Sequence, residues 1–93
     1  MFKEMIGAAP VYEQLAEECT ELAKEALKCA RIIRNENPTP VSISDAQKRL
    51  TEEFTDVILC AEDLNLHADP AIRMAKFTRW YNRLEEVKYA GKA

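Results

Sequence analysis

Residues 44–65, SDAQKRLTEEFTDVILCAEDLN, predict an amphipathic helix at the centre of the fold. The apolar residues of this stretch recur at intervals of four and three, which places them on one face of a helix. These residues are Leu50, Phe54, Val57, Ala61 and Leu64. Ser44 and Gln47 have the spacing of a capping box, in which two side chains satisfy free N–H groups at a helix start. We therefore expect this helix to begin near Ser44 and to end near Asn65.

Two further helices are expected on either side of this one. The segment from Pro10 to Arg34 keeps the same apolar spacing, through Leu15, Cys19, Leu22, Ala26 and Ile33. A third helix is expected to start at Asp69 and Pro70, and its apolar positions are Met74, Phe77, Tyr81 and Leu84. Residues 35–42 contain two prolines together with asparagine and serine, which favours a connector. A short extra helical turn is expected to end at Gly7.

Size and composition restrict the chain to one small helical domain, residues 1–93. Two glycines and four prolines are too few for a turn-dense β fold, and no stretch alternates apolar and polar residues for long. An all-α bundle of three to four helices is the natural packing. The run from Val57 to Ala61 is apolar on nearly every side, so its helix needs more than one partner. We expect homo-oligomerisation to complete the bundle, with this helix near the interface.

Charge and hydropathy exclude several classes of protein. Thirteen lysines and arginines against sixteen aspartates and glutamates give a net charge of −3, without the basic footprint of a nucleic-acid binder. No apolar run approaches the roughly 18 residues of a membrane span. The first residues have no sustained apolar segment of the signal-peptide kind. A cytoplasmic protein that contacts neither nucleic acid nor membrane is therefore expected.

The three cysteines allow a metal site as an alternative to simple packing. Cys19, Cys29 and Cys60, with His67, would supply four ligands, but their spacing contains no C-x₂-C or H-x₃-H pair. An odd number of cysteines without an export signal also argues against a disulfide framework. We expect small, buried apolar residues at these positions.

The acidic residues carry the strongest chemical signal. At about 100° per residue, Glu18, Glu21 and Glu25 form one stripe that borders the apolar face of their helix. Glu53 and Asp56 form another on the next helix. Glu21 and Glu25 are like-charged at i,i+4, where a solvated surface gains from alternating signs. Packing the two helices together would bring these carboxylates to a site that requires a cation, and Mg²⁺ or Mn²⁺ suits oxygen ligands. The alternative is a pair of solvated acidic faces.

A basic stripe on the third helix complements this acidic cluster. Lys76, Arg79 and Arg83 share one helix face, with Trp80 beside them. Cationic side chains together with a metal suit a polyphosphate. The alternative is an ordinary salt-bridged amphipathic helix, since two glutamates follow directly.

Two spaced acidic motifs carry a resemblance to a known family. Residues 17–21 have the form E-E-x-x-E and residues 53–56 the form E-x-x-D. Their order and separation resemble the all-α nucleotide pyrophosphohydrolases of the MazG-like superfamily, which includes dimeric dUTPases and phosphoribosyl-ATP pyrophosphohydrolase. The resemblance covers about residues 12–85. The apolar run after the second motif and the later K-x-x-R-x-x-x-R pattern also look like the family.

The resemblance implies a function and a set of site residues. Its members cleave a nucleoside triphosphate to a monophosphate and pyrophosphate, and they assemble as dimers or tetramers. The implied ligands of Mg²⁺ are Glu18, Glu21, Glu53 and Asp56. The implied catalytic residues are Glu53 and Glu17, the latter as an outer ligand or a helper that orients water. The implied substrate-binding residues are Lys76, Arg79 and Arg83.

Alternatives within and outside this family remain open. The connector is longer than the tight turn of the shortest members, and the chain lacks the extra helices with which a dimeric dUTPase recognises its base. The candidates for base recognition, which the sequence does not rank, are Tyr12, Phe54, Phe77, Trp80 and Tyr81. The nearest alternative enzyme is a phosphoribosyl-ATP pyrophosphohydrolase. The alternative outside the enzymes is a non-catalytic helical oligomerisation and interaction module.

Overall fold

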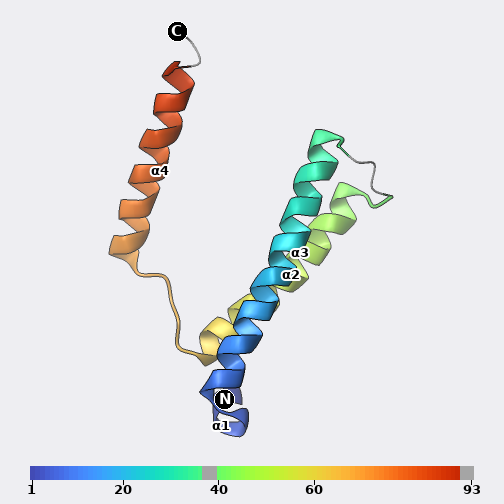
Figure 1. The fold of residues 1–93 in the computed structure, drawn as a ribbon, viewed down its shortest axis with the longest axis vertical. Coiled ribbons are helices and arrows are strands. Elements are labelled where there is room, and N and C mark those ends of the chain that lie inside the picture. The colour runs from blue at the N-terminus through green and yellow to red at the C-terminus, as the bar shows by residue number, and fades with distance from the viewer. Residues whose placement is uncertain (37–39, 91–93) are drawn as a thin grey trace.

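The computed structural model describes residues 1–36 and 40–90, and in these ranges every regular element is a helix. The helices are α1 (Phe2–Ile6), α2 (Ala8–Arg34), α3 (Ile43–Asp63) and α4 (Pro70–Ala90) (Figure 1). The predicted all-α class is confirmed, and so is the short helical turn before Gly7. The connector predicted over residues 35–42 lies partly outside the described residues. None of the helices in the described ranges combines the length and the apolar character that a membrane crossing requires.

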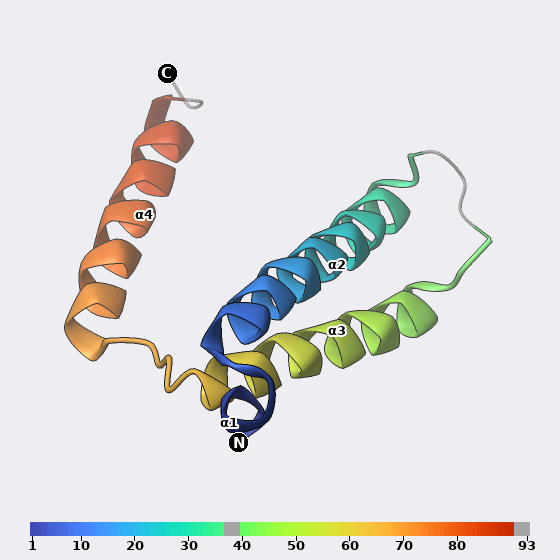
Figure 2. The same ribbon diagram turned by 60° about the horizontal axis from the view of Figure 1, so that its bottom comes forward.

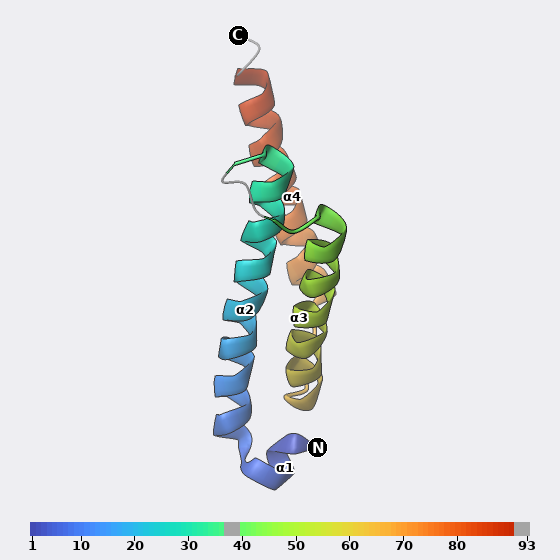
Figure 3. The same ribbon diagram turned by 90° about the vertical axis from the view of Figure 1, so that its right-hand side faces the viewer.

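α2 and α3 run antiparallel and pack side by side (Figure 3). On each helix a row of buried and half-buried positions recurs at intervals of four and three, the geometry of two helices packed lengthwise. On α2 this row consists of Val11, Leu15, Glu18, Leu22, Glu25, Cys29 and Ile32. On α3 and just beyond its end it consists of Ile43, Ala46, Leu50, Glu53, Val57, Cys60 and Leu64. We call these two rows the α2/α3 seam. Three carboxylates occupy positions that apolar residues usually fill.

The seam corrects the apolar face predicted for α2. Cys19, Ala26 and Ile33 were expected in the core but are exposed, whereas Val11 and Cys29 are buried. The prediction grouped the apolar residues and kept the glutamates at their border. In the structure the packed face is rotated toward the glutamates, so that Glu18 and Glu25 lie in the seam.

The prediction for α3 needs a smaller correction. Phe54 was expected in the core but is 52% exposed, while Ala46, which was not singled out, is fully buried. The helix also begins one residue before Ser44. Its N-cap is Ser42, whose Oγ accepts a hydrogen bond from the Asp45 N–H at 3.1 Å. A serine-x-x-aspartate arrangement two residues earlier, Ser42 with Asp45, therefore replaces the predicted Ser44-x-x-Gln47 capping box.

Asp63, the last residue of α3, holds α1 in place through hydrogen bonds. This carboxylate is buried, with only 1% of the side chain exposed, and it accepts hydrogen bonds from the N–H groups of Phe2 and Lys3 at 2.7 Å and 2.9 Å. The Met1 ammonium lies 3.0 Å from the same carboxylate. Gly7, with φ 92°, adopts a backbone conformation that side chains disfavour and so allows the sharp turn into α2.

α4 stands away from the other helices (Figures 1 and 2). Its start is as predicted, because Oδ1 of Asp69 accepts hydrogen bonds from the N–H groups of Ala71 and Ile72 at 2.9 Å and 3.0 Å. Its predicted core residues are not in a core, however. Met74, Phe77, Tyr81 and Leu84 are all more than half exposed. Within one chain, α4 presents its apolar side chains to solvent because it does not pack along α2 or α3.

Candidate metal centre

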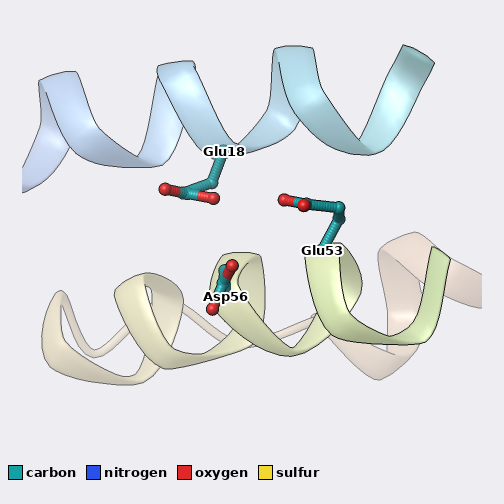
Figure 4. A group of neighbouring side chains, drawn as sticks. All are labelled: Glu18, Glu53 and Asp56. Carbon is teal, nitrogen blue, oxygen red and sulfur yellow. The ribbon is translucent and has the colours of Figure 1, made fainter. Parts of the chain in front are cut away.

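Three predicted metal ligands meet where the middle of α2 faces the middle of α3. Glu18 projects from α2 toward Glu53 and Asp56 on α3 (Figure 4). One carboxylate oxygen of each residue lies within 4.8 Å of the other two. Glu18 and Glu53 are half-buried in the seam, and Asp56 is exposed at its edge. We call this group the carboxylate cluster. The antiparallel pairing creates it, since residues 35 positions apart in the chain become neighbours.

The electrostatics of the carboxylate cluster are unfavourable without a cation. Burial raises the pKa of Glu53, and the nearby charges of Asp56, Glu18 and Glu21 raise it further. Among the described residues, no lysine or arginine forms an ion pair with Glu18, Glu53 or Asp56. Carboxylates that border a low-dielectric seam therefore repel one another, and a bound cation would relieve this repulsion.

Two further acids of α2 lie close to the carboxylate cluster. Glu21, a predicted ligand, is outside the group of three and pairs with Lys24 at 3.2 Å. Glu25 pairs with Lys28 at 3.4 Å through Oε1, while its Oε2 is buried and has no hydrogen-bond partner among the described residues. A buried, unpaired carboxylate oxygen is costly. Glu25 was not predicted as a ligand, although the sequence analysis placed it in the same stripe as Glu18.

Glu17, the predicted catalytic helper, lies outside the carboxylate cluster. Its side chain is exposed on α2, one residue before Glu18 and therefore about 100° around the helix. Gln14 has a more direct contact, because its Nε2 donates a hydrogen bond of 2.7 Å to Oε1 of Glu18. The sequence analysis missed Gln14. Its i,i+4 spacing from Glu18 was the available signal.

The basic stripe does not reach the carboxylate cluster within one chain. Lys76, Arg79 and Arg83 are exposed on α4, and α4 extends away from α2 and α3 (Figure 2). The helix pair thus holds the predicted anionic ligands, and α4 holds the predicted cationic ones. Only a partner molecule or a movement of α4 could bring the two sets together.

A largely apolar cavity opens beside the carboxylate cluster. It has a volume of about 360 Å³ and lies among α1, α2 and α3. Its lining comprises Phe2, Met5, Ile6, Val11, Gln14, Glu18, Asp56, Leu59 and Cys60. Two of these residues, Glu18 and Asp56, also belong to the carboxylate cluster. A ligand that binds the cluster can therefore extend directly into the cavity.

The alternative cysteine and histidine site does not form in the described part of the chain. All three cysteines are free, and Cys19 is exposed while Cys29 is buried. Burial raises the pKa of Cys60, as do the nearby carboxylates, so this thiol stays protonated near neutral pH. The potential metal-binding group among the described residues consists of carboxylates alone.

The carboxylate cluster has the chemistry of a site for a hard divalent cation. Mg²⁺ binds oxygen at about 2.0–2.1 Å in octahedral geometry, so neighbouring ligand oxygens are about 2.9 Å apart and opposite ones about 4.2 Å. The three carboxylate oxygens, which lie within 4.8 Å of one another, would have to move closer together to reach this spacing. Comparisons of the chain with protein-family models, with curated proteins and with solved structures find no match.

Proposed function

We propose that this protein is a Mg²⁺-dependent nucleoside triphosphate pyrophosphohydrolase of the all-α group that its motifs resemble. Hydrolysis of the bond between the α and β phosphates consumes one water and releases a nucleoside monophosphate and pyrophosphate. Control of nucleotide pools is the role that such a reaction serves. The observation that carries the proposal is the meeting of Glu18, Glu53 and Asp56, from two separate acidic motifs, at one point between two packed helices.

Three features support a divalent cation at the carboxylate cluster. The donors are all carboxylate oxygens that lie within 4.8 Å of one another, burial and the neighbouring carboxylates raise the pKa of Glu53, and Oε2 of Glu25 is buried without a partner among the described residues. When bound, Mg²⁺ or Mn²⁺ supplies positive charge for phosphate oxygens and lowers the pKa of the attacking water. The residues that would hold it are Glu18, Glu53 and Asp56, with Glu21 and Glu25 as neighbouring acids.

The side chains of the chain itself account for the remaining steps. Gln14 fixes the carboxylate of Glu18 through its 2.7 Å hydrogen bond, so one ligand is oriented before the substrate arrives. Glu53, a carboxylate of the cluster, accepts the proton of the attacking water. Glu17 assists from the exposed side of α2, as a helper rather than a direct ligand.

The triphosphate also requires cationic side chains, and α4 supplies them in a homo-oligomer. A dimer or tetramer in which α4 of one copy covers the helix pair of another brings Lys76, Arg79 and Arg83 to the phosphates. The apolar side chains of α4 support this assembly, since Trp80 is 67% exposed in the single chain. The outer face of α3 supports it as well, because Ile58 remains 38% exposed.

The decisive experiment measures pyrophosphate release from a panel of NTPs and dNTPs in the presence of Mg²⁺. Glu53→Gln should lower the rate by roughly 100-fold or more, because it removes a ligand and the proton acceptor together. Glu52→Gln is the matched control, since it makes the same change at the neighbouring, exposed position of α3. Equal rates for wild type and Glu53→Gln would refute the proposed site.

The alternatives give different results in the same experiment. A phosphoribosyl-ATP pyrophosphohydrolase would be inactive on the panel but would release pyrophosphate from phosphoribosyl-ATP, and Glu53→Gln would abolish this activity. A non-catalytic interaction module would be inactive on every substrate. The exposed apolar side chains of α4 favour this second alternative, and it predicts that Mg²⁺ leaves the melting temperature unchanged.

A further inference from the structure

The cavity among α1, α2 and α3 is built from two kinds of wall. Val11, Leu59 and Cys60 form an apolar wall on the helix pair, and Phe2, Met5 and Ile6 of α1 form the opposite one. The three side chains of α1 are only partly covered, since Phe2 is 39% exposed. α1 therefore covers one side of an open apolar cavity and is not part of a closed core.

Asp63 determines the position of α1 over the cavity. Its buried carboxylate accepts hydrogen bonds from the first N–H groups of α1, at Phe2 and Lys3. The ring of Phe2 lines the cavity while its backbone is held by Asp63. At the other end of α1, Gly7 makes the turn into α2 with its positive φ. The position of α1 thus depends on one carboxylate, which is 61 residues away in sequence from Phe2.

The lining of the cavity includes two members of the carboxylate cluster. Glu18 and Asp56 belong both to the cavity lining and to the proposed cation site. A molecule that fills this space must therefore combine an apolar body with an anionic group that a cation can bind. The volume of about 360 Å³ lies in the range of small-molecule binding sites.

We propose that this cavity binds the base of the nucleoside triphosphate, and that Asp63 is the positioning residue that holds α1 over it. This inference rests on the proposed function, because the cluster must bind the phosphates for the base to lie in the cavity. A base has flat apolar faces that stack on aromatic rings, and Phe2 supplies such a ring at the wall. Its polar edge can pair with an amide, and Gln14 is the amide at the cavity lining.

The experiment separates the base from the phosphates by calorimetric titration in Mg²⁺. The probes are the α,β-imido analogues of the four dNTPs, which resist cleavage at the bond in question, and inorganic tripolyphosphate, which has no base. At least one analogue should bind wild type about tenfold or more tightly than tripolyphosphate. Phe2→Ala and Asp63→Asn should each remove most of this difference while leaving the affinity for tripolyphosphate unchanged.

Asp63→Asn replaces one of the two accepting oxygens with an amide nitrogen that cannot accept a hydrogen bond, so α1 loses a contact. Matched controls exist for both variants. Leu27→Ala truncates an exposed apolar residue that is not among the cavity residues, and Asp45→Asn changes an exposed aspartate on the same helix as Asp63. Both controls should bind the analogues as wild type does. Far-ultraviolet circular dichroism should show that α2 and α3 remain folded in all four variants.

A kinetic measurement gives the same separation by a second route. Loss of base binding should raise KM for the preferred dNTP about tenfold in Phe2→Ala and Asp63→Asn and leave kcat near its wild-type value. Glu53→Gln should lower kcat instead. A purely structural role of Asp63 would move both parameters, and the affinity for tripolyphosphate with them.

The possible failures are distinguishable. If wild type binds neither the analogues nor tripolyphosphate, the proposed function is wrong and the base site falls with it. If wild type binds all probes equally, or the two variants weaken all probes equally, the base site is wrong while the phosphate site stands. If Phe2→Ala changes the oligomeric state and spares the preference for the analogue, a second copy of the chain fills the cavity and the base site is likewise wrong.

Discussion

The α2/α3 seam and α4 depart from the usual distribution of side chains in opposite directions. In the seam, Glu18, Glu25 and Glu53 occupy places along the contact of two packed helices. On α4, aromatic and aliphatic side chains such as Trp80 and Leu84 extend into solvent. Charges are thus inside where apolar groups are usual, and apolar groups are outside where charges are usual.

The difference indicates what each region lacks in a single chain without ligands. A bound cation would relieve the repulsion between carboxylates gathered beside an apolar seam, because the low dielectric around them strengthens it. A helix with an exposed apolar face needs a surface that covers it. The same bound assembly would satisfy both needs, with a cation and phosphates between the acidic seam and the basic stripe of a partner's α4.

The largest expected effect comes from changing the charge in the seam. Mg²⁺ should raise the melting temperature of wild type by several degrees, because it binds the folded carboxylate cluster and not the unfolded chain. Glu53→Gln should abolish this rise. Without Mg²⁺ the same variant should melt at or above the wild-type temperature, since the substitution removes a repelling charge.

Differential scanning fluorimetry with Mg²⁺ and with a chelator measures both effects. Glu52→Gln serves again as the control and should keep the full response to Mg²⁺. If Mg²⁺ raises the melting temperature of wild type no more than that of Glu53→Gln, the seam binds no cation. This result would favour the interaction module.

The next effect concerns α4 and the surface that covers it. Trp80→Asp places a charge in the exposed apolar face, so it should dissociate the proposed homo-oligomer and lower pyrophosphate release about tenfold or more. Asn82→Asp adds a charge to the same helix about 200° away from Trp80 and should preserve both. Sedimentation velocity measures the assembly. If wild type sediments as a monomer at high concentration, the proposal that a second copy of the chain covers α4 is contradicted.

A smaller effect concerns the hydrogen bonds between Asp63 and α1, and it depends on pH. Burial by itself raises the pKa of Asp63, but the hydrogen bonds from the Met1 ammonium, Phe2 and Lys3 outweigh it and lower the pKa below its ordinary value. A carboxyl whose pKa is lower in the folded state stabilises the fold when ionised. This stability is complete above the unfolded pKa of about 3.9 and is lost as the pH falls through the lower folded pKa.

The measurement compares the melting temperatures of wild type and Asp63→Asn from pH 7 down to pH 2. Wild type should be more stable by several degrees at pH 7, and the difference should shrink toward zero at the acidic end. The difference between the two proteins isolates Asp63, because Glu53 titrates in both. A constant difference over the whole range would show that the loss is one of packing and not of charge.

The smallest effect concerns the orientation of Glu18. Gln14→Leu removes the 2.7 Å hydrogen bond but keeps an apolar stem of similar length on α2, so Mg²⁺ should bind a few-fold more weakly. Gln47→Leu makes the same change at an exposed position of α3 and should have no effect. Titration of Mg²⁺ by calorimetry measures the difference. An unchanged affinity in Gln14→Leu would show that Glu18 needs no such support.

Much of the local structure could be predicted because its causes are local. The caps at Asp69 and before α3, the break after Arg34 and the turn at Gly7 depend on residues next to one another in sequence. The position of the α3 cap was still wrong by two residues, because two serines with similar spacing compete for that role. Predicting Glu18, Glu53 and Asp56 as one group required the additional assumption that α2 and α3 pack side by side.

The amino-acid order alone predicts that the chain is helical, where α2 and α3 begin and end to within two residues, and which acids could share a site. These properties follow from helical periodicity and from capping, which act over a few residues. Only the tertiary structure decided which face of α2 is packed, that Glu21 lies outside the carboxylate cluster, and that Asp63 holds α1 beside an apolar cavity. These features depend on the register of two antiparallel helices and on contacts between residues some 60 positions apart, which local propensity does not encode.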